Sequence, residues 1–459
     1  MKKVFVIGLD CAAPGIVFDN RNEFPNINRL IGRGTHAPFR SIHPPITIPA
    51  WMAMATGKDA GEQGIYGFRH RKPGTYNDMW LSMADRFKEP AIWDIIGEKG
   101  LRSCLVSVPP SYPPMPLNGE RVSCFMTPGP EKDYTYPASL KAEIEGKFGP
   151  FIFDVKFRTE DRDKLKEDLF RMTEQHIEVV KYLIKEKPWQ FFMYVEIGVD
   201  RVHHAFWKFF DKEHRGYTPG NKYENVIMDY YRFIDKGIGQ MLDLLADDTV
   251  VFVVSDHGVK PMKGAFCVNQ WLVEKGYLSV KGPVKEGTSI EELEIDWKNT
   301  KAWAWGGYYS RVFLNVKGRE KQGTIMPFRY EAWRDKLKKE IEAIKGPAGE
   351  PLETKAYRPE ELYGTVKGDY PDLMVYFDDL SWRAAGTMGH KSMYLSENDT
   401  GPDDAMHDWD GIFIMYDPAD PSPRELKSVS ILDLAPTVLD LMGLQVPAGM
   451  KGRSVAKVG

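Results

Sequence analysis

Short apolar runs recur along the chain at wide intervals, and amphipathic segments separate them. The runs span residues 3–9, 103–108, 190–197, 249–255 and 411–416. Each is long enough for one strand and almost entirely apolar, which is typical of strands buried on both faces of a parallel sheet. The pattern therefore predicts the core strands of an open sheet.

The segments between these runs show helical spacing. Residues 91–100 place three isoleucines on one face, and residues 226–247 form a longer amphipathic pattern. Residues 431–443 end at a glycine, the residue that commonly follows a helix C-terminus. Strands that alternate with helices predict a layered α/β fold.

Two long stretches interrupt this alternation. Residues 131–185 begin with a polar segment, and residues 261–403 mix lysine-rich, glycine-rich and aromatic segments. We interpret both as insertions that form a cap or lid on a single domain, whose core spans residues 1–130, 186–260 and 404–459. The length also permits two or three domains. The first stretch carries apolar side chains at helical spacing, namely Leu165, Leu169, Met172, Val180 and Leu183.

Composition restricts the classes of partner. The 459 residues are 42% hydrophobic, which allows a large core, and the net charge of −4 comes from mixed signs. Without a basic excess, a nucleic-acid polymer is not expected as a partner. No apolar stretch approaches the ~20 residues of a membrane span, and the first apolar run is too short for a signal peptide. We therefore expect no membrane partner.

The cysteines are widely separated. Cys11, Cys104, Cys124 and Cys267 form no CxxC pattern. This spacing predicts free thiols and a cytoplasmic location.

Carboxylates and imidazoles adjoin several of the apolar runs. Asp10 follows the first run, Asp200 the third, and Asp256 and His257 the fourth, while His407 precedes the last. Open α/β sheets bind ligands beyond the carboxyl ends of their strands. These side chains are also the ligand types that suit zinc, manganese or iron. The pattern therefore predicts a site for two metal ions.

Asp200 and His204 are separated by one helical turn. If a helix begins after the third run, both side chains lie on one face, about 6 Å apart at Cβ, and His203 points elsewhere. One ion could then contact both. Taken singly, each of these residues also has an ordinary interpretation. Asp10 could be a turn residue, and His204 or His407 could be an ordinary polar histidine.

The segment HPPITIPAWMAMATG, residues 43–57, places Thr47 before a short helical run. Taken alone, such a threonine more often caps the helix. Pro49 suits the first helical turn, and the free N–H groups of that turn favour an anion. A metal ion can lower the pKa of a threonine hydroxyl and make it nucleophilic. Thr47 is therefore either a cap or a nucleophile for attack on phosphorus.

Taken together, these segments resemble the alkaline phosphatase superfamily, in particular its branch of type I phosphodiesterases and nucleotide pyrophosphatases with related predicted phosphohydrolases and phosphomutases. The resemblance covers nearly the whole chain. It rests on VIGLD, PPITIPAWMAMATGKDAGEQGIYGF, VPPSYPPMPLNGERVSCFMTPGP, GVDRVHH, VVSDHG, MHDWDGIF and ILDLAPTVLDLMGLQVPAGMKGRSV. It implies an α/β three-layer sandwich with a mostly parallel central sheet and inserted cap segments.

The resemblance also implies a role for each candidate residue. Thr47 would attack a phosphoester and form a phosphothreonine, which a water activated at the second ion would hydrolyse. Zinc is the usual metal of the phosphodiesterase branch, and manganese serves in the mutase branch. The ligands would be Asp10, Thr47, Asp256 and His257 for one ion, and Asp200, His204 and His407 for the other.

The sequence departs from this branch after the nucleophile segment. Nucleotide pyrophosphatases usually carry a phosphate-binding asparagine there, and Phe68 occupies the comparable position. Oxyanion stabilisation would then come from the Ile48 N–H or from a basic side chain such as Arg69, Lys260 or Lys263. The segment TIPAW also lacks the Cys or Ser and the following xPxR of sulfatases, which argues against sulfate esters.

Two further segments offer substrate groups. The aromatic side chains of residues 303–309 could stack on a base or sugar, although packing within the cap is the simpler interpretation. His390 could contact a phosphate, and it is the main rival to His407 as the last ligand. We prefer His407, because H-x-x-x-G followed by an apolar strand matches the superfamily pattern.

These observations predict a two-metal phosphohydrolase, above all a phosphodiesterase, that acts on a small-molecule phosphoester. One alternative is a phosphomutase or phosphotransferase, in which the phosphothreonine passes its phosphoryl group to a second hydroxyl. The other is a non-catalytic binding member of the fold.

Overall fold

The computed structural model describes residues 2–456, which divide into two compact units. The first unit contains the residues up to 63, residues 82–259 and the residues from 407 onward. The second contains residues 64–81 and 260–406. Met1 and residues 457–459, which the predicted domain included, lie outside the described residues.

The two predicted insertions fall in different units. Residues 261–403 lie within the second unit, together with residues 64–81, which the sequence analysis placed in the core. Residues 131–185 lie in the first unit, where α7 (Arg162–Glu186) packs against α8 (Gly198–Phe210) and α9 (Val226–Leu242). The helix predicted within that stretch is confirmed. A cap or lid function of either stretch stays a prediction.

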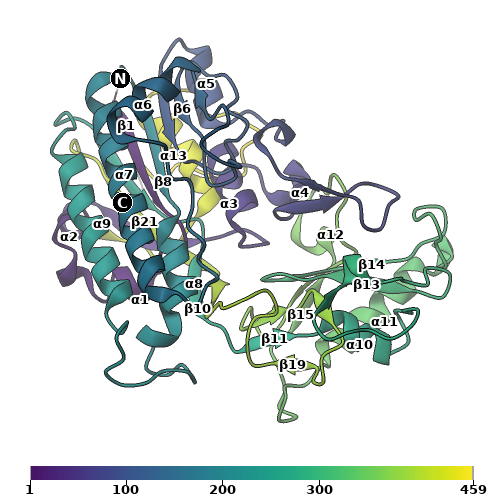
Figure 1. The fold of residues 1–459 in the computed structure, drawn as a ribbon. Helices are drawn as coiled ribbons and strands as arrows, with labels where there is room; N and C mark the ends of the chain where they lie inside the picture. Colours follow the sequence, from purple (N-terminus) through teal and green to yellow (C-terminus); the bar gives the residue numbers. More distant parts are fainter. Residues whose placement is uncertain (1, 457–459) are drawn as a thin grey trace. The chain divides into compact units, whose positions relative to one another are not determined.

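A ten-stranded sheet forms the centre of the first unit (Figure 1). Its strand order is β22-β2-β21-β9-β1-β8-β5-β6-β7, with β23 also paired to β2. All five predicted strands belong to it: β1 (Val4–Leu9), β5 (Ser103–Val106), β8 (Phe191–Glu196), β9 (Val250–Val254) and β21 (Asp410–Tyr416). The others are β2 (Thr35–Arg40), β6 (Gly119–Val122), β7 (Thr135–Tyr136), β22 (Arg424–Glu425) and β23 (Val429–Ser430).

The middle of the sheet is parallel and buried. Every residue of β1 is buried, as its apolar sequence predicts for a strand covered on both faces. Val4 pairs with Phe191 of β8 on one side and with Val250 of β9 on the other, both in parallel register. The carboxyl ends of these three strands therefore meet at one edge of the sheet.

The last predicted strand, β21, runs antiparallel to β9, with Phe413 opposite Val254. Its direction has a consequence for the edge just described. The beginning of an antiparallel strand lies beside the end of its neighbour. Residues that precede β21 are thereby brought to the carboxyl end of β9.

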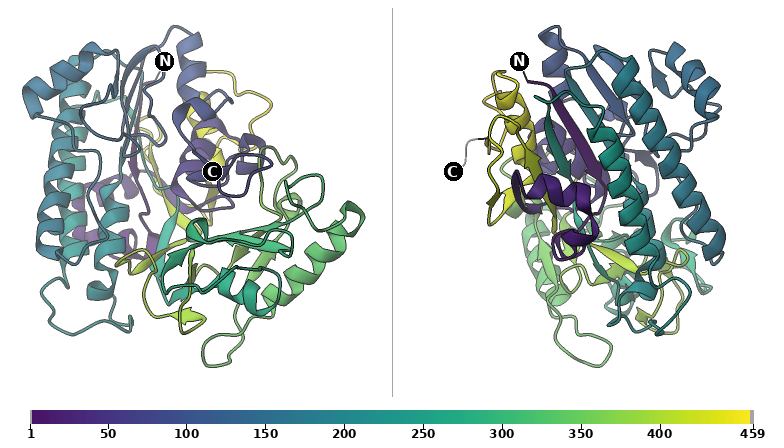
Figure 2. Two further views of the ribbon diagram at one scale, coloured as in Figure 1. Left: turned by 45° about the vertical axis from the view of Figure 1, so that its right-hand side comes forward. Right: turned by 90° about the vertical axis from the view of Figure 1, so that its left-hand side faces the viewer.

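Helices cover both faces of this sheet. One layer contains α2 (Pro25–Ile31), α7, α8 and α9, and the other contains α3 (Thr47–Thr56), α5 (Ile92–Glu98) and α13 (Leu434–Leu441). The right-hand view of Figure 2 shows the long helices on one side of the strands and the C-terminal helix on the other. The first unit is thus the three-layer α/β arrangement that the resemblance implies. Shorter helices are α1 (Pro14–Val17), α4 (Ala60–Gln63) and α6 (Ser139–Phe148).

The second unit has its own sheet and core. Its four-stranded antiparallel sheet has the order β13-β14-β16-β15, and α10 (Val268–Glu274) and α11 (Tyr330–Glu342) lie in the same unit. Trp303 and Trp305 are buried in its hydrophobic core, as the packing interpretation expects. The strands of this sheet are β13 (Ala302–Trp305), β14 (Ser310–Leu314), β15 (Lys355–Tyr357) and β16 (Leu373–Tyr376).

Two simpler predictions concern the whole chain. The four cysteines are free and buried, as predicted. Among the described residues, no helix combines the length and the apolar character that crossing a membrane requires.

Candidate active site

Three strand ends in the first unit supply the carboxylates of the site. Asp10 follows β1 directly, Asp256 follows β9 after one serine, and Asp200 lies in the first turn of α8, just beyond β8. All three are almost completely buried. Their common position at one sheet edge follows from the parallel register of the strands.

One group of side chains consists of Asp10, Asp256 and His257, and we call it the first group. Nε2 of His257 lies 3.2 Å from Oδ2 of Asp256 and 3.7 Å from Oδ1 of Asp10. Each residue offers one ligand atom, and these atoms lie within 4.8 Å of one another. This spacing suits a single metal ion.

In the first group, one carboxylate oxygen of each aspartate accepts a hydrogen bond from the surrounding protein. The Trp51 indole N–H donates to Oδ2 of Asp10 at 2.7 Å, and the Cys11 backbone N–H donates to Oδ1 of Asp256 at 3.2 Å. Oδ1 of Asp10 and Oδ2 of Asp256 have no hydrogen-bond partner among the described residues. Buried oxygens without a donor are costly, and a bound cation would satisfy both.

Gly8 makes room for the indole of Trp51. A Cβ atom on Gly8 would lie 2.5 Å from Cη2 of Trp51, which is closer than packed atoms can approach. The glycine of VIGLD therefore lets α3 bring Trp51 down to the carboxylate of Asp10.

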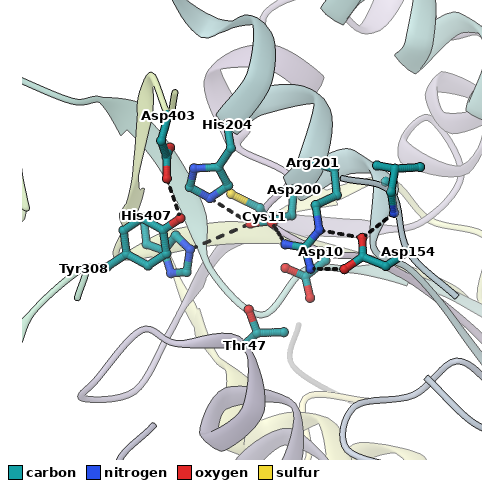
Figure 3. A network of polar contacts seen from close by, with 12 residues as sticks. Asp10, Cys11, Thr47, Asp154, Asp200, Arg201, His204, Tyr308, Asp403 and His407 are labelled. Carbon is teal, nitrogen blue, oxygen red and sulfur yellow. Dashed lines mark hydrogen bonds and ion pairs between the residues drawn. The ribbon is translucent and has the colours of Figure 1, made fainter. Parts of the chain in front are cut away.

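Asp200, His204 and His407 form the second group. Nε2 of His204 lies 3.1 Å from Oδ1 of Asp200, and Nε2 of His407 lies 3.7 Å from the same oxygen. Their ligand atoms also lie within 4.8 Å of one another (Figure 3). His203 points away and contacts the Tyr231 hydroxyl at 3.2 Å, as predicted from helical spacing.

The two groups adjoin each other through their histidines. The rings of His257 and His407 stack with centroids 3.7 Å apart. His407 lies in β20 (Ala405–Asp408), shortly before β21, and the antiparallel direction of β21 brings it beside the end of β9. The sequence named His407 as a candidate ligand, and the strand direction explains how it reaches the site.

Backbone carbonyls orient both histidines. Nδ1 of His257 lies 3.1 Å from the Gly258 carbonyl, and Nδ1 of His407 lies 2.7 Å from the Pro45 carbonyl. A carbonyl only accepts, so each Nδ1 carries the proton and each Nε2 keeps its lone pair. This is the tautomer that a metal ligand requires, and the carbonyl is the usual supporting partner.

Burial changes the protonation of the site. It raises the pKa of Asp10 and Asp256 well above the ordinary value, and the charges of Asp200 on Asp10, and of Asp10 on Asp256, add to this. It lowers the pKa of His257 to about 4 and that of His407 well below its ordinary value. Both imidazoles are therefore neutral near pH 7. A divalent cation would relieve the repulsion between the carboxylates.

Thr47 is the first residue of α3, and its hydroxyl faces the first group. Oγ1 lies 3.4 Å from Nε2 of His257, and the residue is 3% exposed. The helix begins after Ile46, and no side-chain hydrogen bond caps it. The capping interpretation of Thr47 is therefore wrong. Pro49 lies in the first turn, as predicted.

The family of the chain follows from a comparison with known families. The model of the family described as type I phosphodiesterase / nucleotide pyrophosphatase matches residues 4–410. The chain belongs to this family. Its membership indicates phosphoester hydrolysis of the phosphodiesterase or nucleotide pyrophosphatase type. The curated proteins contain no match to the chain.

In this member of the type I phosphodiesterase family, a basic side chain contacts the carboxylate of the second group. Arg201 follows Asp200, and its Nη1 lies 2.6 Å from Oδ2 of Asp200. Burial alone would raise the pKa of Asp200, but His204 and Arg201 outweigh burial and hold it well below its ordinary value. The sequence analysis quoted Arg201 within GVDRVHH but gave it no role, although its place after a predicted ligand was the available signal.

The candidate substrate groups lie in two places. Ile48 is buried in the first turn of α3. The others lie in the second unit, where Arg69 contacts Glu291, Lys260 contacts Asp379 and Lys263 contacts Asp378. A role of these groups in binding substrate stays a prediction.

Phe68 and His390 also belong to the second unit. Nε2 of His390 lies 2.8 Å from the Thr387 hydroxyl, and His407, not His390, joins the second group. The preference for His407 over His390 therefore agrees with the geometry. Phe68 carries no hydrogen-bonding side chain that could replace the family's asparagine.

Proposed function

We propose that this protein is a two-metal phosphodiesterase in which Thr47 is the nucleophile. The proposal rests above all on one observation: the Thr47 hydroxyl lies 3.4 Å from Nε2 of His257, which is a member of the first group. A lone hydroxyl at a helix start would be unremarkable. Here it adjoins two buried clusters of ligand-type side chains, in a chain of the phosphodiesterase family.

The donor sets suit zinc or manganese. The first group would hold one ion through two carboxylates and an imidazole, and the second group would hold another through one carboxylate and two imidazoles. When bound, such ions supply Lewis-acid stabilisation of the charges that develop on the attacking and leaving oxygens. Asp10 and Asp256 carry the unpartnered oxygens that such an ion would satisfy.

The chain's own residues define the covalent steps. Oγ1 of Thr47 gives up its proton and forms a bond to phosphorus as the first ester P–O bond breaks, and the leaving alkoxide takes up one proton to become the free alcohol. The oxygen of water then bonds to phosphorus as the bond between phosphorus and Oγ1 breaks, which releases a phosphomonoester, and a proton from the water restores the Thr47 hydroxyl. Pro49 and Ile48 shape the first turn of α3, whose free N–H groups favour a phosphoryl oxygen.

The intermediate provides the test. Protein loaded with zinc or manganese is mixed with bis(p-nitrophenyl) phosphate, quenched in acid and digested, and the peptide that carries Thr47 is analysed by mass spectrometry. We expect a p-nitrophenyl phosphoryl adduct on Thr47 and a burst of p-nitrophenol. Turnover without any adduct, in a Thr47→Ala protein as in the wild type, would exclude the nucleophilic role.

A product assay distinguishes hydrolysis from phosphoryl transfer. A hydrolase releases the phosphomonoester, whereas a transferase gives a new ester when a second alcohol is present. We expect the phosphomonoester as the main product in the presence of excess glycerol. A dominant glycerol phosphoester would favour the transferase alternative.

A further inference from the structure

Arg201 forms ion pairs with two carboxylates at once. Its Nη1 lies 2.6 Å from Oδ2 of Asp200, and its Nε and Nη2 each lie 2.8 Å from an oxygen of Asp154. Figure 3 shows this arrangement beside the second group. A guanidinium bound through two parallel hydrogen bonds to one carboxylate is held in a fixed orientation.

The surroundings of Arg201 keep its charge close to Asp200. The guanidinium lies over the rings of Phe125 and Phe157, at 5.2 and 4.6 Å, and the side chain is 12% exposed. Phe157 also contacts the ring of His204, with centroids 5.8 Å apart. Water is largely excluded from this corner, so charges there interact more strongly than at the surface.

The two groups therefore differ in charge. With both carboxylates ionised, as cation binding requires, the first group has two carboxylates and one neutral imidazole, a formal charge of −2. The second group has one carboxylate and two imidazoles, a formal charge of −1 when both imidazoles act as neutral metal ligands, and Arg201, which Asp200 shares with Asp154, offsets part of this charge. The donor atoms are equally numerous, but the electrostatic attraction for a divalent cation is not equal.

We propose that Arg201 compensates the charge of Asp200 and so makes the two cation sites unequal, with tight binding at the first group and weak, exchangeable binding at the second. This inference rests on the proposed two-metal function. Arg201 also holds Asp200 towards His204 and His407 when the weak site is empty. Of the two oxygens of Asp200, Oδ2 is bound to Arg201, so Oδ1 remains for the cation.

Calorimetric titration of the metal-free protein with zinc chloride tests the inequality. We expect two binding steps whose dissociation constants differ at least tenfold. His204→Ala should remove the weak step alone, and Asp256→Asn should abolish the tight step. Two steps of equal affinity would overturn the inference and leave the proposed function standing. If neither zinc nor manganese binds at all, the proposed function itself fails.

Variants of Arg201 test the cause. Arg201→Gln removes the charge and should tighten the weak step at least tenfold, whereas Arg201→Lys keeps the charge and should leave it within about threefold of the wild type. If Gln and Lys weaken binding alike, Arg201 only positions Asp200 and the charge argument is wrong.

Asp154 offers an independent variant, because its side chain is 30% exposed and tolerates change more readily than a buried one. Asp154→Asn frees the guanidinium to act on Asp200 alone. We expect the weak step to weaken at least threefold and the tight step to stay unchanged. Tighter binding in the second group would contradict the proposal. Thermal unfolding of each metal-free variant shows whether the fold is kept.

Discussion

Oγ1 of Thr47 lies 3.4 Å from Nε2 of His257, although Thr47 begins the helix α3 and His257 follows the end of strand β9. The contact exists because α3 packs on one face of the sheet while β9 ends beside it. It places a hydroxyl next to the lone pair that the Gly258 carbonyl orients. The proposed attack of the Thr47 hydroxyl on phosphorus depends on this contact.

Removal of this hydroxyl should abolish turnover. Thr47→Ala should lose at least ~10³ in kcat on a phosphodiester, the scale expected when the attacking group itself is removed. Thr47→Ser keeps a hydroxyl on the same backbone and should retain measurable burst kinetics. Zinc content by elemental analysis should be unchanged or only modestly reduced in both. Near-normal kcat for Thr47→Ala would exclude Thr47 as the nucleophile.

His204 and its neighbour His203 form a matched pair on α8. His204→Ala should lose about one equivalent of bound metal, because its Nε2 lies in the second group. His203→Ala should keep both equivalents, because its ring turns to the Tyr231 hydroxyl. Elemental analysis after gel filtration, at a zinc concentration that fills both sites, reads out the difference. Equal losses in the two variants would contradict the assignment of the second group.

Trp51 should matter through its hydrogen bond to Asp10. Trp51→Phe keeps an aromatic ring but removes the donor at 2.7 Å, and we expect a loss of about 10–100-fold in zinc affinity, as for other partners that support a metal ligand. Trp189→Phe is the control, because that buried indole donates to the Ile184 carbonyl instead. Both variants should lose some stability on heating. Only Trp51→Phe should lose affinity, and an equal effect from Trp189→Phe would rule out the specific role.

A buried ion pair between α7 and β8 should make stability depend on pH. His176 Nδ1 lies 3.1 Å from Oε2 of Glu196. Burial lowers the pKa of His176, but Glu196 outweighs burial and raises it above its ordinary value of 6.5. A group whose pKa is higher in the folded state than in the unfolded state stabilises the fold. This contribution is fully present below the pKa of the unfolded state and is lost as pH rises through the pKa of the folded state.

The variant His176→Asn isolates this contribution. Its free energy of unfolding should fall furthest below that of the wild type near pH 6, and the difference should shrink as pH rises past the raised pKa of His176. Urea unfolding of both metal-free proteins across this range gives the difference. A difference that stays constant with pH would show that packing, and not charge, explains the effect.

Local sequence predicted much of the framework. Nearly continuous apolar runs identified five of the ten strands of the central sheet, and Asp10, Asp200 and Asp256 were located because carboxylates follow three of these runs, where open α/β sheets bind ligands. Helical spacing alone separated His203 from His204. These features depend on residues close together in the chain, where periodicity carries information.

Features that depend on distant pairing were not predictable. The antiparallel direction of β21, which brings His407 to the site, is set by its pairing with β9 across more than a hundred residues. Asp154 lies in an irregular segment without periodicity, so its contact with Arg201 left no signal in the sequence. The position of residues 131–185 in the helical layer likewise depends on packing against α8 and α9.

The central claim is that two clusters of side chains hold two cations beside Thr47. Anomalous X-ray diffraction at the zinc absorption edge, on crystals grown with excess zinc, tests it most directly. The account predicts two peaks, one among Asp10, Asp256 and His257 and one among Asp200, His204 and His407, with Oγ1 of Thr47 next to the first. Ordered side chains at both groups with no anomalous peak at either would contradict it.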